Sequence, residues 1–169
     1  MATPAVAAPP RRVVSLSNCL DVILVHVADR AQIAALSHYA REPQGSTIAA
    51  LARTLPATWE TAEEVLALQP DLVLTSRHSS LPTRNALNRL GVKAALFGVP
   101  KTVAESLAQV REVAVLVGHP ERGERLVARI EAALAAAAPP PGWRPLKAAL
   151  YQPNGFSPGG EALIGELMT

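Results

Sequence analysis

The stretch that most constrains the fold is residues 61–76, TAEEVLALQPDLVLTS, because it holds a complete helix-to-strand transition. Its opening letters form a capping box, in which Thr61 caps a helix and Glu64 reaches back to the cap. Pro70 disfavours helical backbone at the residue before it, so the helix is expected to end at about Gln69. The closing letters, DLVLTS, have the apolar character of a strand buried in a parallel sheet. Alternating helices and parallel strands are therefore expected.

Strand-like and helix-like patterns alternate along the rest of the chain in the same way. Short runs of apolar and β-branched residues predict further strands at 12–17, 32–37, 92–98 and 146–152. Capping signals and apolar spacing predict further helices after Asn18, an expected N-cap, and at 81–91, 102–118, 120–138 and 161–168. Repeated strand–helix–strand units predict an α/β fold, with a parallel sheet flanked by helices in a Rossmann-like lobe.

Breaker residues and composition divide the chain into four expected segments. The Ala- and Pro-rich start lacks the basic beginning and apolar core of a signal peptide. A helix of nineteen residues would form a rod of roughly 28 Å before the proline run that follows it. The expected segments are a flexible leader at 1–11, an N-terminal α/β lobe at 12–118, a long connecting helix at 119–140, and the start of an incomplete second lobe at 146–169.

Composition narrows the possible functions. The chain has 169 residues, of which 49% are hydrophobic and 4% aromatic, which indicates a globular core of Ala, Val and Leu. The net charge is +2 and the basic residues are scattered, so a nucleic-acid partner is not expected. One cysteine, Cys19, leaves neither an internal disulfide nor a cysteine zinc cluster. No apolar run reaches the roughly 20 residues of a membrane span, so a membrane-spanning protein is not expected.

Two residues resemble catalytic nucleophiles. Ser157 lies in GFSPG, which fits the G-x-S-x-G pattern of a nucleophile elbow. Pro158 has no backbone N–H to offer an oxyanion hole, and no histidine follows Ser157, so a Gly/Pro turn is preferred. Cys19 is expected in the first turn of a helix, where a thiol pKa can fall, but it has no paired base and is expected to be a small buried residue. A Rossmann-like enzyme domain using one of these two residues remains an alternative.

Seven residues are expected at one edge of the sheet, because they follow the carboxyl ends of predicted strands, where α/β folds bind ligands. They are Ser17, Asn18, His38, Tyr39, Trp59, Arg77 and His78. His38 and His78 leave a two-histidine metal site open, although loop histidines are more often surface or hydrogen-bonded residues. For Trp59, a role as a plug that packs the loop onto the core is equally open.

Six strings along the chain resemble one known family. They are RVVSLSNCLDVIL, IAALSHYAREP, AEEVLALQPDLVL, LNRLGVKAALFG, ERGERLVARIEAAL and YQPNGFSPGGEALIGELM. From about Arg12 to Met168, the chain resembles the substrate-binding proteins of iron-siderophore and cobalamin ABC importers, which have two α/β lobes joined by one long helix. The third string is the most specific, since family members show an acidic residue, an apolar turn and then L-x-P-D-L-V.

The resemblance implies a periplasmic binding protein rather than an enzyme, with no resident cofactor or metal. Its ligand would be a ferric siderophore or a corrinoid, a chelate that carries iron or cobalt, captured between two lobes and delivered to an ABC permease. Tyr39 matches the place of a pocket tyrosine in corrinoid-binding relatives, and Arg77 could meet a carboxylate or catecholate with a forked hydrogen bond. A haem or metal-ion binder of the same fold, with Tyr39, His38 or His78 as ligand, remains an alternative.

The resemblance also implies a role for exposed acids. In this family, a glutamate at the start of the helix that Thr61 caps docks onto arginines of the permease, and here that residue is Glu63. A second glutamate from the other lobe does the same, for which Glu161 and Glu166 are the candidates. The alternative for Glu63 is an acid that the helix dipole favours at that position.

Overall fold

The computed structural model describes residues 8–144, 147, 149–150 and 161–168. Its centre is a five-stranded sheet in the order β3-β2-β1-β4-β5, and every neighbouring pair is parallel. The strands are β1 (Val13–Ser15), β2 (Ile33–Ser37), β3 (Ala57–Thr58), β4 (Leu72–Ser76) and β5 (Ala94–Phe97). The predicted α/β class with a parallel sheet is therefore confirmed.

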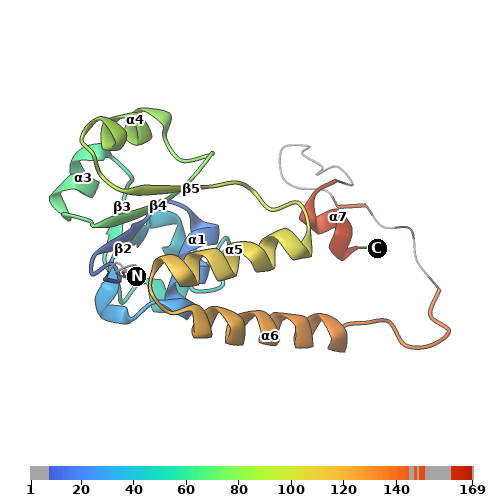
Figure 1. The fold of residues 1–169 in the computed structure, drawn as a ribbon. Coiled ribbons are helices and arrows are strands. Elements are labelled where there is room, and N and C mark those ends of the chain that lie inside the picture. The colour runs from blue at the N-terminus through green and yellow to red at the C-terminus, as the bar shows by residue number, and fades with distance from the viewer. Residues whose placement is uncertain (1–7, 145–146, 148, 151–160, 169) are drawn as a thin grey trace, which may run out of the picture.

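Helices cover both faces of this sheet (Figure 1). One face carries α1 (Asn18–Val27), α5 (Val103–Leu116) and α6 (Pro120–Ala136), and the other carries α3 (Ala62–Ala67) and α4 (Leu81–Arg89). Shorter elements are α2 (Ala49–Ala52), α7 (Leu163–Leu167) and the 3-10 turns η1 (Arg30–Gln32) and η2 (His38–Arg41). Each face has its own buried cluster, with Leu24, Leu74 and Val113 on the first and Val14, Val65 and Leu87 on the second.

Some predicted elements differ from the observed ones. The pattern at 32–52 gave no sign of α2 or η2, and β3 is too short to leave a strand signal. The strand expected at 146–152 falls largely outside the described residues, and Lys147, Ala149 and Leu150 within it have no strand assignment. The helix expected from 161 is present as the shorter α7, and none of the described helices is long and apolar enough to cross a membrane.

The start of α1 corrects the expected N-cap. Ser17 is the N-cap, with extended backbone, and Asn18 is the first helical residue. The side chain of Asn18 is engaged elsewhere, because its Nδ2 donates to the carbonyl oxygen of Gly45 at 2.7 Å. Asn18 therefore joins the start of α1 to the loop that follows η2, at the carboxyl edge of the sheet.

The unit 61–76 folds nearly as expected, with two corrections. The Thr61 hydroxyl accepts from the backbone N–H of Glu64, but the Glu64 carboxylate reaches beyond the cap and accepts from the N–H of Trp59 at 2.7 Å. The helix ends at Ala67 rather than Gln69, which has a positive φ of 47° immediately before Pro70. Avoidance of helical backbone before proline accounts for this early end.

The described part of the expected leader contacts the lobe. The backbone N–H groups of Arg11 and Arg12 donate to the Asp71 carboxylate at 2.6 and 2.9 Å. Pro9 packs on Gly118, whose φ of 87° and lack of a side chain leave room for it. Residues 8–11 thus contact the lobe through backbone hydrogen bonds and packing, and the flexibility of the leader stays a prediction.

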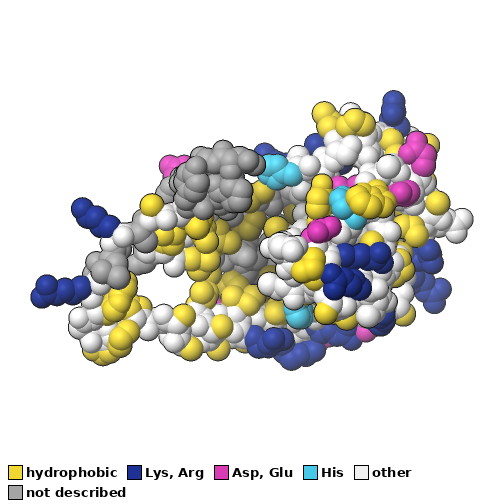
Figure 2. All heavy atoms as spheres, turned by 180° about the vertical axis from the view of Figure 1, so that it is seen from behind, with side chains coloured by type: hydrophobic (Ala, Val, Ile, Leu, Met, Phe, Trp, Pro, Cys, Tyr) yellow, Lys and Arg dark blue, Asp and Glu magenta, His cyan; other side chains and the backbone are white. Residues whose placement is uncertain are grey.

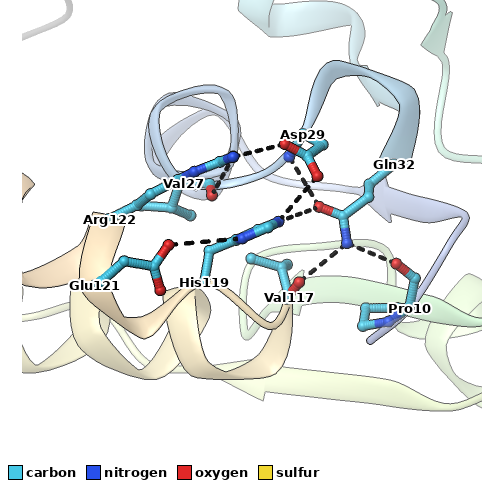
Figure 3. A network of polar contacts seen from close by, with 8 residues as sticks. All are labelled: Pro10, Val27, Asp29, Gln32, Val117, His119, Glu121 and Arg122. Atoms are coloured by element: carbon cyan, nitrogen blue, oxygen red, sulfur yellow. Dashed lines mark hydrogen bonds and ion pairs between the residues drawn. The ribbon is translucent and has the colours of Figure 1, made fainter. Parts of the chain in front are cut away.

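A polar network fixes the start of α6 to the lobe (Figure 3). His119 Nε2 lies 3.1 Å from Gln32 Oε1 and 3.2 Å from Asp29 Oδ2, and Arg122 Nη2 donates to Asp29 Oδ1 at 2.7 Å. The hydrogen bond from Arg122 is the main reason why the pKa of Asp29 is lowered. Gln32 also donates to the carbonyl oxygens of Pro10 and Val117. The expected connecting helix thus begins as an integral part of the lobe.

Candidate functional site

The strand order creates a switch point between β1 and β4, because the chain winds outward from these two central strands in opposite directions. In open parallel sheets, ligands bind beyond the carboxyl ends of the strands at such a point. The residues after β1, β2, β3 and β4 therefore gather at one edge of the sheet. Several cavities lie along this edge of the described chain, and two of them are lined by predicted residues.

The larger of the two, which we call the aromatic cavity, has a volume of about 670 Å³. It lies between the turn η2 after β2, the loop after β3, and the helices α3 and α4. Its lining residues are His38, Tyr39, Trp59, Glu60, Thr61, Ala62, Glu63, His78, Ser80, Pro82, Thr83, Ala86 and Arg89. Four of the seven residues predicted at this edge thus share one cavity: His38, Tyr39, Trp59 and His78.

Three rings form a continuous surface in this cavity. The rings of His38 and Trp59 are stacked with centroids 4.3 Å apart, and the ring of Tyr39 lies 3.8 Å from that of His38. Trp59 is 70% exposed and Tyr39 is 52% exposed. Trp59 is therefore not a plug on the core, and its face is available to a ligand. Figure 2 shows hydrophobic, histidine and acidic side chains together over the part of the lobe that carries β3, α3 and α4.

The position of Trp59 follows from the helix α3. The Glu64 carboxylate accepts from the backbone N–H of Trp59 and from the hydroxyl of Thr58 at 2.8 Å. Because Glu64 is fixed in the first turn of α3, these bonds hold the end of β3 against the helix. The acid that was expected to close a capping box thus positions the exposed tryptophan.

The second cavity, which we call the switch-point cavity, has a volume of about 230 Å³. Its lining residues are Ser17, Asn18, Cys19, Leu20, Ser76, His78, Phe97, Gly98, Val99, Pro100 and Gln109. It contains the predicted residues Ser17 and Asn18, and it shares His78 with the aromatic cavity. Cys19 is exposed rather than buried, which corrects the expectation for this residue.

The remaining predicted residues are spread over different parts of the described chain. The backbone N–H of Arg77 donates to the carbonyl oxygen of Phe97, while the Arg77 residue is exposed and lines neither cavity. Glu63 is exposed in the first turn of α3, at the rim of the aromatic cavity. Glu161 is exposed before α7. Glu166 Oε2 accepts from the backbone N–H of Val103 at 2.6 Å, at the start of α5. Ser157 lies outside the described residues.

Two acids near this edge were not recognised as functional from the sequence. Asp21 is fully buried and accepts from the hydroxyl of Ser37 at 2.5 Å and from its backbone N–H at 3.2 Å. Burial raises the pKa of Asp21 to about 7. Burial also raises the pKa of Glu60, which lines the aromatic cavity. The sequence does not indicate whether an acidic residue at the start of a helix or in a loop is buried.

A third cavity, of about 690 Å³, lies at the opposite end of the molecule between residues 8–11 and the network around His119. We favour the carboxyl edge as the functional site because the switch point and the exposed rings lie there. Among the described residues, no group of three or more His, Cys, Asp or Glu side chains is arranged to hold a metal ion.

The fold is an α/β lobe with a parallel sheet and cavities at its switch point. Residues 13–167 match the model of the Periplasmic binding protein family. The chain therefore belongs to this family. A comparison with curated protein sequences gave no match.

Solved structures share the fold. A possible iron-binding (periplasmic solute-binding) protein from Staphylococcus epidermidis gives a TM-score of 0.71 at 15% identity, covering 94% of this chain and 64% of that one. The apo periplasmic heme-binding protein of Roseiflexus sp. RS-1 gives 0.62 at 28% identity, covering 75% and 48%. The periplasmic vitamin B12 binding protein of Vibrio cholerae gives 0.60 at 23% identity, covering 76% and 49%. The chain thus spans less than two thirds of each of these structures.

Proposed function

We propose that this chain is a substrate-binding component of an ABC importer in the periplasm, binds a metal chelate at its carboxyl edge and delivers it to a membrane permease. The observation that carries the proposal is the surface of stacked, exposed rings in the aromatic cavity of a periplasmic binding protein lobe. Flat aromatic faces suit the planar ring system of a corrinoid or the aromatic groups of a siderophore. The chain acts by binding, without a chemical step.

A haem ligand is the second candidate within the same function. Two observations support it: similar structures include heme-binding proteins, and Tyr39, His38 and His78 line one cavity. Tyrosine and histidine side chains are both established ligands of haem iron. Haem would need one such side chain as ligand rather than a cluster of three.

Titration of the chain with hemin, a cobinamide and a ferric siderophore distinguishes these candidates. Haem ligated by the protein shifts the Soret band, and Tyr39→Phe is expected to abolish that shift if the phenolate oxygen is the ligand. A corrinoid or siderophore should instead quench tryptophan fluorescence, and Tyr39→Phe should leave its affinity within about threefold. Failure of all three chelates to bind at millimolar concentration would contradict the proposed function.

Trp59→Ala should weaken the binding of whichever chelate the chain takes by about tenfold, or about 1.4 kcal/mol. The reason is that Trp59 presents a largely exposed ring next to His38, and a ligand stacked there would lose that contact. Trp143→Ala is the matched control, because Trp143 is 52% exposed but lies beyond α6. Isothermal titration of the two variants tests the prediction. Equal losses in both variants would contradict a role for the cavity.

Glu63→Ala should weaken docking to the permease and reduce its dependence on salt concentration. Glu63 is exposed at the second helical position of α3, where its charge can reach a partner without leaving the protein surface. Charges at the rim of an interface act mainly on association rate and salt dependence. The measurement is association with the reconstituted transporter at several salt concentrations. Glu131→Ala, an exposed acid on α6, is the control. A salt dependence that is identical in the two variants would favour the helix-dipole explanation.

A further inference from the structure

Glu60 occupies an unusual position between β3 and α3. Its backbone has a φ of 68°, a left-handed conformation that is uncommon for residues other than glycine. Two hydroxyl groups hold it there. The backbone N–H of Glu60 donates to Thr58 Oγ1 at 3.0 Å, and Thr83 Oγ1 donates to the Glu60 carbonyl oxygen at 2.8 Å. Strained backbone that is fixed from both sides is characteristic of binding sites.

Glu60 lines the aromatic cavity and is partly buried there. Glu60 Oε1 is buried and has no hydrogen-bond partner among the described residues, although Glu60 lines the cavity. Leaving a buried acceptor unpaired is unfavourable, and a donor that arrives with a ligand removes this cost. A ligand group that donates a hydrogen bond to the Glu60 carboxyl group would therefore be favoured in this cavity.

The charges around Glu60 indicate which ligand group fits. Burial is the main reason why the pKa of Asp21, on α1, is raised, and the charge of Glu60 adds to this, so Asp21 is an acid near Glu60. Glu63 adds a second acid to the cavity rim, while Arg89 is at the end of α4. A ligand carboxylate next to Glu60 would meet like charge, whereas an amide, hydroxyl or ammonium group would donate a hydrogen bond.

We propose that Glu60 is a specificity-determining residue, which accepts a hydrogen bond from an N–H or O–H group at the edge of the bound chelate. The inference rests on the proposed function and narrows its ligand class. The aromatic cavity takes chelates whose periphery carries donors, such as the amides of a corrinoid or the ammonium group of a hydroxamate siderophore. It takes them in preference to haem, whose periphery carries carboxylates.

The test compares three probes on the whole chain at pH 7.5: dicyanocobinamide, ferrioxamine B and hemin. Glu60→Gln keeps the shape of the side chain and removes its charge, and Glu60→Asp keeps the charge but retracts it by one methylene group. Glu131→Gln is the charge-matched control on the far side of the lobe. Isothermal titration gives the affinity, and thermal melting identifies any variant that fails to fold.

At least one donor-bearing probe should bind more tightly than hemin. Glu60→Gln should weaken that probe about tenfold and leave hemin unchanged or tighter, with Glu60→Asp intermediate and Glu131→Gln unchanged. The bound probe decides between the corrinoid and the siderophore. If hemin binds best, or if Glu60→Gln and Glu60→Asp leave a donor-bearing probe unaffected, the role of Glu60 is overturned while the proposed function stands. If none of the three probes binds, the proposed function fails and this inference fails with it.

Discussion

Asp21→Asn is expected to stabilise the chain at pH 8. The stability of the parent falls between pH 5 and pH 8, and the variant should show little of this fall. The cause is burial, which raises the folded-state pKa of Asp21 from 3.8 to about 7, while hydrogen bonds from Ser15 and Ser37 oppose the shift. The folded chain therefore binds a proton that the unfolded chain releases at lower pH. Stability falls as the pH rises from the unfolded pKa to the folded one.

The expected size follows from the shift in pKa. The rise in the pKa of Asp21 corresponds to about 4 kcal/mol, and more than half of this is lost between pH 5 and pH 8. Asparagine fits the site, because its oxygen can accept the backbone N–H of Ser37 and its amide can donate to the Ser37 hydroxyl oxygen. The measurement is urea unfolding of parent and variant at several pH values.

Asp29→Asn is the control for this experiment. The pKa of Asp29 is lowered, mainly by Arg122, so its contribution is complete above the unfolded pKa and is lost as the pH falls. Because His119 lies 3.2 Å from Asp29, the control is made in a His119→Gln background, where Asp29→Asn should leave the slope between pH 5 and pH 8 unchanged. An Asp21→Asn variant that keeps the slope of the parent and is less stable at pH 8 would mean that Asp21 is already charged in the folded state at pH 5, which contradicts the prediction.

The elements with strong local signals could be predicted from the sequence. Thr61 and Thr102 cap α3 and α5, each accepting from the backbone N–H three residues later. The run 71–76 gives β4, which is buried along its whole length. These features depend on interactions within a few residues, so a single sequence contains them. The parallel sheet could also be predicted, because a helix between two successive strands leaves few ways to connect them other than in parallel.

The candidate site could be predicted only in part. Four residues were expected at one edge of the sheet because they follow predicted strands. The structure places all four around one cavity: His38, Tyr39, Trp59 and His78. The stacking of His38 on Trp59 depends on β2 pairing with β3, whose two residues carry no recognisable strand pattern. Pairing between distant segments is decided by tertiary contacts that local patterns do not contain.

The three acids of 61–76 illustrate the same limit. Glu63 is exposed, as its position in the first turn predicts. Glu64 and Asp71 instead bind backbone N–H groups outside their own elements, at Trp59 and at Arg11 and Arg12. Asp21 is in the first turn of α1, where the helix directs it onto Ser37 at the end of β2. An acidic residue in a first turn looks the same in sequence whether it faces solvent or the core.

Gly123→Val is expected to lower the stability of the chain by about 3 kcal/mol, at the upper end of the cost of overpacking a core. Gly123 is buried where α6 crosses α5. A Cβ atom at this position would lie 2.5 Å from the Cβ atom of Ala114 and 3.6 Å from the carbonyl oxygen of Val110. Because Ala114 belongs to a helix packed on the sheet, the contact can be relieved only by moving α6 outward.

The absence of a side chain at Gly123 therefore sets how closely α6 packs against α5. Thermal melting measures the effect, and the melting temperature should fall by about 10 °C for a chain of this size. Ala128→Val introduces the same side chain at an exposed position of α6 and should cost no more than the difference in helix propensity, about 0.7 kcal/mol. In the milder variant Gly123→Ala, the further change Ala114→Gly should restore part of the lost stability, because it removes the other atom of the clash. If Gly123→Val melts with the parent, or if Ala114→Gly gives no recovery, α6 does not owe its position to this contact.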